Sequence, residues 1–286
     1  MTRERLGSLR VGLIGDPVAH SLSPAIQQPA LDALGVPATY ELWRTPASEL
    51  GRRLADLRAP QVLGANVTVP HKVAVLDLID DISESARRAG AVNTIVCRDE
   101  RLIGENTDVH GFATALAEAC PDVAGRPALI LGAGGAARAV ALALGTLGIP
   151  DVSVANRDRG RAERLAADLA PASVRVAGLD EEEVAPGLAT ARLLINATSL
   201  GWHRGEMPLP ADLLSRLPED ALVVDLTYRE TDLLAAAASR GLATLDGLSM
   251  LVHQGARALE LWTGRAAPLD VMMSAARRAR DDRATP

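Results

Sequence analysis

Residues 126–148 read RPALILGAGGAARAVALALGTLG. The apolar run ALIL predicts a short buried strand, the glycines after it predict a tight turn, and the alanine-rich remainder predicts a helix that ends at Gly148. A glycine-rich turn between a strand and a helix is typical of dinucleotide sites, because the helix N-terminus donates N–H groups to a pyrophosphate. We therefore expect a doubly wound, dinucleotide-binding domain around this stretch.

The turn itself, GAGGAA at 132–137, has small residues where a dinucleotide needs them. Gly132 permits the tight turn, and Gly134 lets the backbone approach the pyrophosphate. Ala137 is small enough for the helix to pack on the strand. The alternative interpretation is a glycine-rich turn that binds no ligand.

The tip of the next predicted strand indicates which dinucleotide is bound. An NAD site usually has Asp or Glu about 20 residues after the glycines, where it holds the ribose 2′-OH. This chain has Asn156 and Arg157 there, followed by Arg159 and Arg161. Because a guanidinium matches phosphate oxygens, these residues favour NADP(H). Asp158 would repel the 2′-phosphate if its carboxylate pointed inward, and a solvated charged loop is the alternative.

Strands and helices alternate along most of the chain, which predicts βαβ units and mostly parallel sheets in an α/β protein. In the first block we expect strands at 10–15, 38–45 and 62–69, a hairpin turning at 98–100, and helices at 23–35, 47–57, 70–80 and 83–90, with Ser23 as the first N-cap. In the second block we expect strands at 151–157, 191–198 and 221–228 and helices at 161–169 and 231–241. A helix at 107–120 should join the blocks, and helices at 247–264 and 268–279 should fold back on the first block.

Composition excludes several classes of protein. The chain has 286 residues, enough for two domains, and a net charge of −6 argues against nucleic-acid binding. No apolar stretch approaches the roughly 18 residues of a membrane span, and the charged start MTRERLGSLR is unlike a signal peptide. Cys97 and Cys120 lack metal-ligand spacing, so we expect ordinary thiols and no metal. These features predict a cytoplasmic protein.

Four polar clusters of the first block end at predicted strand tips: HSLSP (20–24), NVTVPHK (66–72), AVNT (91–94) and NTD (106–108). Ligands in parallel sheets bind at the carboxyl ends of the strands, so these clusters should line one crevice. Their candidate residues are Ser21, Ser23, Asn66, Thr68, Lys72, Asn93 and Asp108. Hydroxyls, amides, one cation and one carboxylate suit a polyhydroxylated, anionic small molecule.

Lys72 is the only lysine of the chain, although the chain is rich in arginine. Arginine does not lose its proton in proteins, whereas lysine can, so a proton-transfer role would explain why lysine stands at this position. Each candidate has a structural alternative: Lys72 as a solvated helix residue, Asp108 as a helix cap, and Asn66 and Asn93 as partners of turn backbone.

Taken together, these motifs resemble the shikimate dehydrogenase family along nearly the whole chain. The matching segments, in the family's order, are GDPVAHSLSP, NVTVPHK, GAVNT, NTDVHGF, GAGGAARA, ANR, INATSLG, DLTY and GLSMLVHQGARALELWTG. The resemblance implies reduction of 3-dehydroshikimate to shikimate by NADPH. It implies a substrate-binding, catalytic α/β domain of residues 1–108 and 247–286 and a Rossmann NADP-binding domain of residues 109–246. The chain would act as a monomer or homodimer, with a small-molecule substrate and no nucleic-acid or membrane partner.

The resemblance also implies roles for single residues. The catalytic pair would be Lys72 and Asp108. The substrate carboxylate would be bound by Ser21, Ser23, Thr68 and Tyr228. The ring hydroxyls would be held by Asn66, Asn93 and Gln254. The pyrophosphate would be bound by Gly132, Ala133, Gly134, Gly135 and Ala136, and the 2′-phosphate by Asn156, Arg157 and Arg161. The nicotinamide side would be lined by Thr198, Ser199, Leu226 and Met250.

The chain departs from the family's common pattern at a few positions, which keeps alternatives open. Val109 and Ser249 stand where glycine is common, Trp202 stands where methionine is common, and the segment after Tyr228 is shorter and lacks a proline. A quinate/shikimate or aminoshikimate dehydrogenase, NAD-dependent in some cases, is the close alternative. A non-catalytic dinucleotide sensor would be expected to lack Lys72 or Asp108. A methylenetetrahydrofolate-type dehydrogenase would call for an aromatic-lined pocket.

Overall fold

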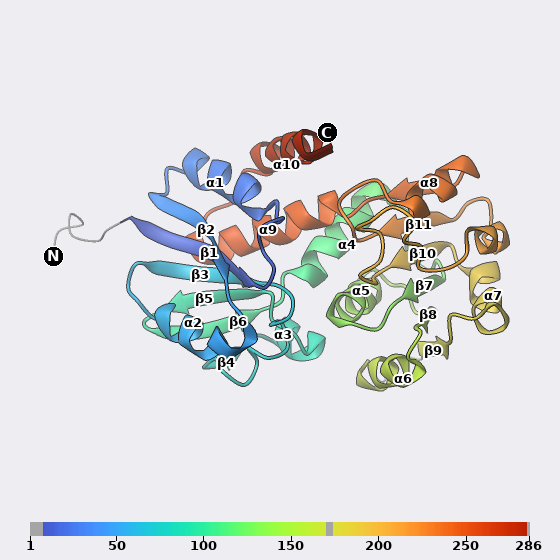
Figure 1. Ribbon diagram of the computed structural model, residues 1–286, viewed down its shortest axis with the longest axis horizontal. Coiled ribbons are helices and arrows are strands. Elements are labelled where there is room, and N and C mark those ends of the chain that lie inside the picture. The colour runs from blue at the N-terminus through green and yellow to red at the C-terminus, as the bar shows by residue number, and fades with distance from the viewer. Residues whose placement is uncertain (1–7, 170–173, 285–286) are drawn as a thin grey trace. The chain divides into compact units, whose positions relative to one another are not determined.

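The computed structural model describes residues 8–169 and 174–284, and its chain divides into two compact units (Figure 1). Unit 1 consists of Met1–Gly111 and Val252–Pro286, and unit 2 consists of Phe112–Leu251. The chain passes from one unit to the other within α4 (Asp108–Ala119) and again within α9 (Leu248–Thr263). The predicted boundaries at 108/109 and 246/247 lie near these divisions and remain a prediction, because compactness alone does not define functional domains.

Unit 1 is built on a mixed sheet of six strands in the order β2-β1-β3-β5-β6-β4. The strands are β1 (Leu9–Gly15), β2 (Ala38–Arg44), β3 (Val62–Val67), β4 (Asp81–Ile82), β5 (Thr94–Arg98) and β6 (Arg101–Glu105). β1 pairs in parallel with β2 and β3, whereas β5 is antiparallel to β3 and β6. Asp99 and Glu100 have positive φ in the turn between β5 and β6, which confirms the predicted hairpin.

The helices of unit 1 include α1 (Ser23–Ala33), α2 (Leu50–Asp56), α3 (Glu84–Ala89) and α10 (Leu269–Ala284), with a short 3₁₀ turn, η2 (Ala47–Glu49), before α2. α10 packs against α1, and Trp262 of α9 donates to the carbonyl of Ile95 at 2.9 Å. The two last helices therefore fold back on the first block, as predicted. α3 also begins and ends as predicted, because Ser83 accepts from Ala86 N and Gly90 is left-handed.

Two local predictions in unit 1 are wrong. Residues 70–80 form turns and no α-helix, because the carbonyl of Lys72 accepts from Val92 N at 2.7 Å instead of from an N–H four residues on. Ser23 is the first residue of α1 and not its N-cap, a place taken by Leu22 without a side-chain cap bond. The hydroxyl of Ser23 instead lies 3.0 Å from that of Ser21.

Unit 2 is built on a fully parallel six-stranded sheet in the order β12-β11-β10-β7-β8-β9. Its strands are β7 (Ala128–Leu131), β8 (Val152–Ala155), β9 (Val174–Ala177), β10 (Leu193–Asn196), β11 (Leu222–Asp225) and β12 (Ala243–Leu245). Its helices are α5 (Gly135–Thr146), α6 (Arg159–Asp168), α7 (Glu181–Thr190) and α8 (Asp232–Ser239), with the 3₁₀ segment η3 (Ala211–Arg216). The chain order reverses between β7 and β10, which is the switch point where doubly wound sheets bind ligands. The predicted Rossmann fold is confirmed.

The sequence prediction missed β9, α7, η3 and β12 in unit 2. α7 contains Pro186 and Gly187, which interrupt a helical pattern, yet its start is capped by Asp180, whose carboxylate accepts from Glu183 N. β12 has only one partly buried residue, Leu245, so it has no strand-like alternation to recognise. These elements form because the neighbouring strands and helices offer them partners.

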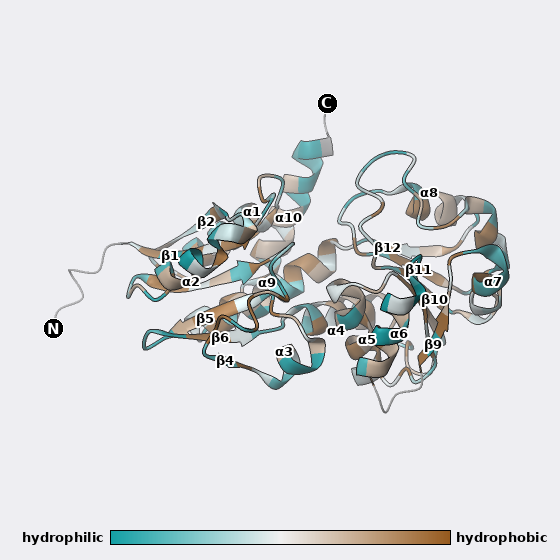
Figure 2. Ribbon diagram, turned by 60° about the horizontal axis from the view of Figure 1, so that its bottom comes forward, coloured by the Kyte–Doolittle hydropathy of each residue, from teal (hydrophilic) through white to brown (hydrophobic). Residues whose placement is uncertain are grey.

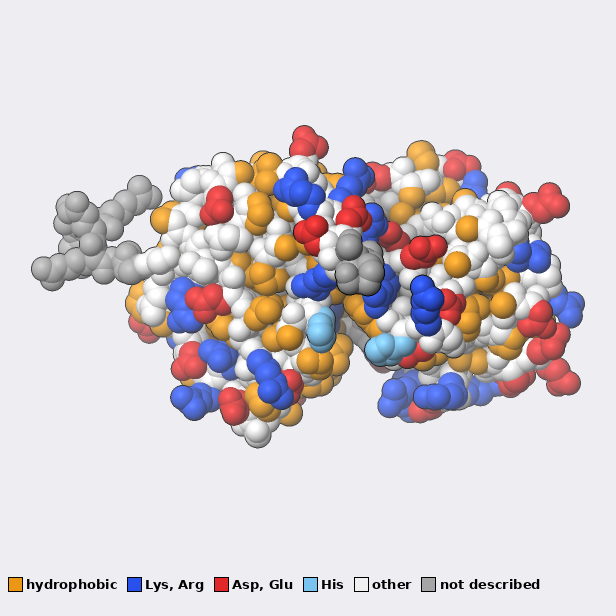
Figure 3. Space-filling view, turned by 45° about the horizontal axis from the view of Figure 1, so that its top comes forward, with side chains coloured by type: hydrophobic (Ala, Val, Ile, Leu, Met, Phe, Trp, Pro, Cys, Tyr) orange, Lys and Arg blue, Asp and Glu red, His pale blue; other side chains and the backbone are white. Residues whose placement is uncertain are grey.

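Hydropathy follows the layers of each unit (Figure 2). All four residues of β7, β8, β10 and β11 are buried, because helices cover both faces of a parallel sheet. On the face drawn in Figure 3, the acidic and basic side chains of the described residues are intermixed. Within the described residues, no helix combines the length and apolar character that a membrane crossing requires.

Candidate active site

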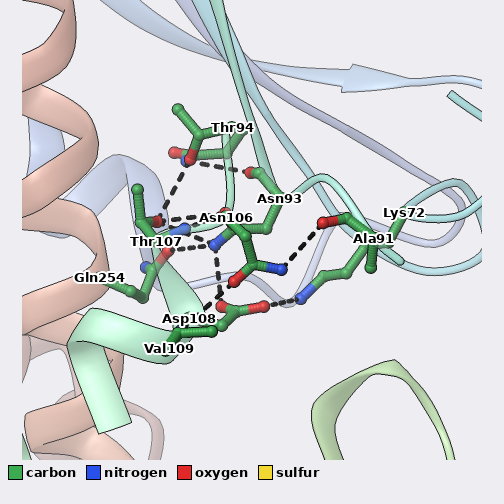
Figure 4. Close-up of polar contacts among 10 residues, drawn as sticks. Lys72, Ala91, Asn93, Thr94, Asn106, Thr107, Asp108, Val109 and Gln254 are labelled. Atoms are coloured by element: carbon green, nitrogen blue, oxygen red, sulfur yellow. Dashed lines mark hydrogen bonds and ion pairs between the residues drawn. The ribbon is translucent and has the colours of Figure 1, made fainter. Parts of the chain in front are cut away.

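The ammonium of Lys72 and the carboxylate of Asp108 form an ion pair in unit 1, with 2.6 Å between Lys72 Nζ and Asp108 Oδ2 (Figure 4). Lys72 lies in the turns after β3, and Asp108 is the first residue of α4. Their side chains are 24% and 10% exposed, so the lysine side chain keeps some access to solvent while the aspartate side chain is nearly buried. The pair is thus an oriented cation with an open side.

Asn93 fixes the other oxygen of this carboxylate. Asn93 Nδ2 donates to Asp108 Oδ1 at 2.8 Å and to Thr107 Oγ1 at 2.9 Å, and Gln254 Oε1 lies 3.3 Å from the same nitrogen (Figure 4). Asn93 Oδ1 accepts from Thr107 N at 2.7 Å, so the predicted role with turn backbone is also present. Oδ1 of Asp108 therefore accepts from the Asn93 amide and Oδ2 accepts from the Lys72 ammonium, which restricts rotation of the carboxylate.

Asn106 caps the start of α4, which leaves Asp108 free for Lys72. Asn106 Oδ1 accepts from Val109 N at 3.3 Å, and Asn106 Nδ2 donates to the carbonyl of Ala91 at 2.9 Å. The alternative in which Asp108 caps the helix is therefore wrong. Asn106 and Thr107 were missed as site residues, although both stand in the NTD motif next to Asp108.

Asn66 lies at the end of β3 and is 5% exposed. Asn66 Nδ2 donates to Thr94 Oγ1 at 3.1 Å, and Asn66 Oδ1 accepts from the hydroxyl of Tyr40 at 2.7 Å. Burial raises the pKa of Tyr40, so its hydroxyl stays a donor at any ordinary pH. Tyr40 and Thr94 were not identified from the sequence as partners of Asn66. Both lie within β-strands, and their positions in the sequence do not mark them as contacts of Asn66.

The serines and Thr68 follow neighbouring strands. Ser21 Oγ accepts from Ser23 N at 3.1 Å, and Ser23 is 8% exposed. A side chain on Gly15, the last residue of β1, would lie 2.4 Å from Thr68 Cγ2, so the ends of β1 and β3 lie in close contact. Unit 1 therefore holds hydroxyls after β1 and β3, the amides of Asn66 near the end of β3 and of Asn93 just before β5, and an ion pair between residues that follow β3 and β6.

The glycine-rich turn of unit 2 fits a pyrophosphate. Gly132 has φ +107°, and a Cβ there would lie 2.9 Å from the carbonyl oxygen of Ala197, so only glycine fits. Gly134 is the N-cap of α5 and makes no side-chain cap bond, and a Cβ on it would meet nothing within 4 Å. The N–H groups that follow, at Gly135 and Ala136, are therefore free of a side-chain cap and available to an anion.

The residues at the tip of β8 differ in how far they are engaged by their neighbours. Asp158 caps α6 by accepting from Arg161 N at 3.2 Å, so its carboxylate is engaged by the helix start. Asn156 Nδ2 donates to the carbonyl of Asp158 at 2.8 Å, and Arg159 pairs with two glutamates. Among the described residues, Arg157 makes no hydrogen bond or ion pair and is exposed. Arg157 is thus available to a phosphate, whereas Arg161 Nε lies 3.4 Å from Asp158 Oδ2.

A buried network joins the ends of β10 and β11. Asn196 Oδ1 accepts from Thr198 Oγ1 at 2.7 Å, and Asn196 Nδ2 donates to Asp225 Oδ2 at 3.0 Å. Asp225 is 0% exposed and also accepts from Thr231 Oγ1 and Thr227 N, each at 2.9 Å. One carboxylate therefore holds both the loop with Thr198 and the loop after β11.

The remaining candidates of unit 2 lie on these loops and at the start of α9. Tyr228 packs edge-on against Trp202, with 5.1 Å between ring centroids and 82° between planes. A Cβ on Gly247 would lie 2.0 Å from the carbonyl oxygen of Leu226, so the start of α9 closely contacts the end of β11. Ser199 is exposed, and Met250 is half-buried.

Family models match most of the chain. Residues 13–95 match the shikimate dehydrogenase substrate binding domain, residues 115–228 match shikimate / quinate 5-dehydrogenase, and residues 247–277 match the shikimate 5′-dehydrogenase C-terminal domain. A curated relative, shikimate dehydrogenase (NADP(+)) of Symbiobacterium thermophilum, is 49% identical, with 93% of this chain and 92% of the relative covered.

Solved structures agree with these matches. The shikimate 5-dehydrogenase of Thermus thermophilus, in complex with NADP(H) and shikimate, is 44% identical with a TM-score of 0.85, covering 95% of this chain and 99% of that one. Quinate dehydrogenase from Corynebacterium glutamicum, in complex with NAD, is 34% identical with a TM-score of 0.84, covering 94% and 98%.

Proposed function

The chain belongs to the shikimate dehydrogenase family, and on that premise we propose that it is an oxidoreductase that reversibly reduces 3-dehydroshikimate to shikimate with NADPH. The observation that carries the proposal is the Lys72–Asp108 pair, with 2.6 Å between Nζ and Oδ2. Its open side offers a proton donor to a bound ketone.

When bound, NADPH supplies the hydride for the ketone carbon. The carbonyl oxygen then gains negative charge, and the Lys72 ammonium stabilises that charge and donates a proton to the oxygen. Asp108 keeps the ammonium oriented throughout, because its other oxygen is fixed by Asn93. In the reverse direction, Lys72 accepts the proton from the hydroxyl of shikimate.

The substrate would be bound mainly by groups that are already held in place. Asn66 and Asn93 are 5% and 2% exposed, and with Gln254 we assign them to the ring hydroxyls. We assign the substrate carboxylate to Ser21, Ser23, Thr68 and Tyr228. Hydroxyl donors around an anionic group stabilise it without a buried cation.

The cofactor would be bound by unit 2. We assign its pyrophosphate to Gly132, Ala133, Gly134, Gly135 and Ala136. We assign its 2′-phosphate to Asn156, Arg157 and Arg161, since Asp158 is engaged in capping α6. We assign its nicotinamide side to Thr198, Ser199, Leu226 and Met250. We further propose a cytoplasmic enzyme, monomeric or homodimeric, whose functional domains are residues 1–108 with 247–286 and residues 109–246.

The deciding experiment measures formation of the reduced cofactor from shikimate with NADP⁺ and with NAD⁺, and from quinate as the competing substrate. We expect the highest kcat/KM for shikimate with NADP⁺. Arg157→Ala should lower the preference for NADP⁺ over NAD⁺, whereas Arg164→Ala, which removes the same charge from within α6, should not. Higher kcat/KM with quinate, or with NAD⁺, would overturn the proposal in favour of a quinate-type enzyme.

A further inference from the structure

The loop before α1 carries Ser21 and Ser23, and its backbone is held from the other end of the chain. Arg283, in the last turn of α10, donates from Nη1 to the carbonyl of His20 and from Nη2 to the carbonyl of Ser21, the latter at 3.1 Å. One guanidinium thus spans two successive peptide carbonyls, a geometry that a planar fork of donors fits.

Pro24 explains why this loop depends on an outside donor. A carbonyl just before a helix can be satisfied by an N–H three or four residues on, but Pro24, three residues after Ser21, has no N–H, and the N–H of Ala25, four residues on, does not donate to this carbonyl. Within residues 8–169 and 174–284, Arg283 is the only donor to the carbonyl of Ser21. Without Arg283 this carbonyl would lose its donor, and the loop would be held by fewer bonds, among them that from Ser21 N to the carbonyl of Val18 at 3.0 Å.

Helix geometry places Arg283 over the loop. Met272, Ala275 and Ala276 are 0%, 4% and 0% exposed on α10, which packs against α1. Arg283 follows Ala276 by seven residues (283 − 276), which is about two helical turns, so it lies on the same face as the buried stripe. The packing of α10 on α1 therefore brings the guanidinium to the start of α1.

The orientation of this peptide is transmitted to both hydroxyls. Ser21 Oγ accepts from Ser23 N at 3.1 Å and lies 3.0 Å from Ser23 Oγ. A rotation of the Ser21 backbone would therefore displace its own hydroxyl and break the contact that orients Ser23.

We propose that Arg283 is a positioning residue for the carboxylate site: it fixes the carbonyls of His20 and Ser21 so that the two serine hydroxyls face the anionic group of the substrate. The identity of that anion rests on the proposed function, whereas the anchoring of the loop does not. Arg283 acts through the loop and has no contact of its own with the substrate.

Hydrogen exchange tests the anchoring without any substrate. Arg283→Ala should speed exchange of the amides in residues 18–23, because the loop loses its tie to α10. Arg277→Ala removes the same charge from an exposed position of the same helix and should leave this segment unchanged. Equal exchange of residues 18–23 in Arg283→Ala and wild type would overturn the proposal.

Kinetics test the consequence for the carboxylate. Arg283→Ala should raise KM for shikimate by about fivefold to tenfold, the effect of losing one or two hydrogen bonds, with little change in kcat or in KM for NADP⁺. Arg283→Lys should recover part of the loss, since one carbonyl keeps a donor. In a Ser21→Ala background, Arg283→Ala should have a much smaller effect, because its route to the substrate is gone.

Two outcomes are distinguishable from each other. If KM for shikimate rises equally with and without Ser21, or rises equally in Arg277→Ala, then Arg283 does not act through the serine loop and the proposal is overturned. If the wild type does not oxidise shikimate at all, the proposed function fails, while the exchange of residues 18–23 still decides the role of Arg283.

Discussion

At the scale of single residues, the amino-acid composition of the chain points to Lys72 as a candidate for proton transfer. This residue is the only lysine in the chain, and its ammonium lies 2.6 Å from a carboxylate that Asn93 holds from the other side. Arginine would keep the charge but cannot give up its proton near neutral pH. The proposed proton transfer would therefore account for lysine at this position, whereas charge alone would not.

We expect Lys72→Arg to lower kcat for shikimate oxidation by about a hundredfold or more, the usual contribution of a general acid or base, while KM changes much less. Lys72→Ala should also lose turnover and should bind shikimate more weakly, because the cation is gone. Steady-state kinetics of both variants measure the split. Turnover of the Arg variant at the wild-type rate would exclude proton transfer by Lys72.

Cys97 and Cys120 are free thiols, as predicted, and both are shielded from reaction. Burial raises the pKa of the Cys97 thiol to about 12, and burial also raises the pKa of Cys120. Since only the thiolate reacts, both thiols should undergo thiol–disulfide exchange at pH 8 more slowly in the native protein than in urea, Cys97 by roughly a hundredfold or more. Ellman's reagent measures this, and rapid labelling of the native protein would contradict it.

At the scale of elements, helix starts decide which carboxylates are available for chemistry. Asn106 caps α4 and so leaves Asp108 to Lys72, whereas the carboxylate of Asp158 is engaged in capping α6. Both aspartates lie beside polar motifs in the sequence, and only the hydrogen bonds of the helix start separate their roles. A backbone hydrogen bond likewise decides the conformation around Lys72. Lys72 lies in turns because its carbonyl accepts from Val92 N, a residue distant in sequence.

The loops after β10 and β11 should depend on Asp225. The carboxylate of Asp225 accepts hydrogen bonds from Asn196, Thr227 and Thr231. In Asp225→Asn, the amide NH₂ would face donors instead of accepting from them, and the remaining amide oxygen is a weaker acceptor than a carboxylate. Hydrogen bonds to a charged group contribute about 1.5–3 kcal/mol each, so the free energy of unfolding should fall by about 2–5 kcal/mol. Urea unfolding of the variant measures this change.

Two further variants control that experiment. Asp212→Asn, at an exposed aspartate of η3, should leave the free energy of unfolding within about 0.5 kcal/mol of wild type. Thr231→Ser keeps both the bond to Asp225 and the cap of α8, so it should be far milder than Thr231→Val. A neutral Asp225→Asn would mean that the network does not stabilise these loops.

At the scale of the whole molecule, each unit has a core and a set of candidate binding residues of its own. Unit 1 holds the serines, amides and ion pair, and unit 2 holds the glycine-rich turn and Arg157. This division is consistent with a substrate half and a cofactor half, joined through α4 and α9.

Hydrogen exchange with each ligand tests this division. NADP⁺ alone should protect residues 132–137 and 156–161 most strongly, and shikimate alone should protect residues 20–24, 66–72 and 91–108. The reason is that a ligand slows exchange where it accepts from or orders backbone groups. NAD⁺ serves as the control, with protection at 132–137 but less at 156–161. Protection by NADP⁺ confined to unit 1 would contradict the assignment.

The sequence by itself determined the features that depend on neighbouring residues. The glycine turn after a buried strand, the alternation of strands and helices, and the cap and glycine of α3 are local, so short-range sterics and hydrogen bonds suffice to predict them. The unique Lys72 and the polar clusters at strand ends likewise indicate the candidate site from the sequence alone.

Only the tertiary structure decided what depends on residues that are distant in sequence. The pairing of Lys72 with Asp108, the support of Asn66 by Tyr40, and the tie from Arg283 to Ser21 each join separate elements. The same holds for residues 70–80, whose sequence pattern predicts a helix. They form turns instead, because Val92 N donates to the carbonyl of Lys72. Local preference amounts to a few tenths of a kcal/mol per residue, so a single buried long-range hydrogen bond of about 1 kcal/mol can override it.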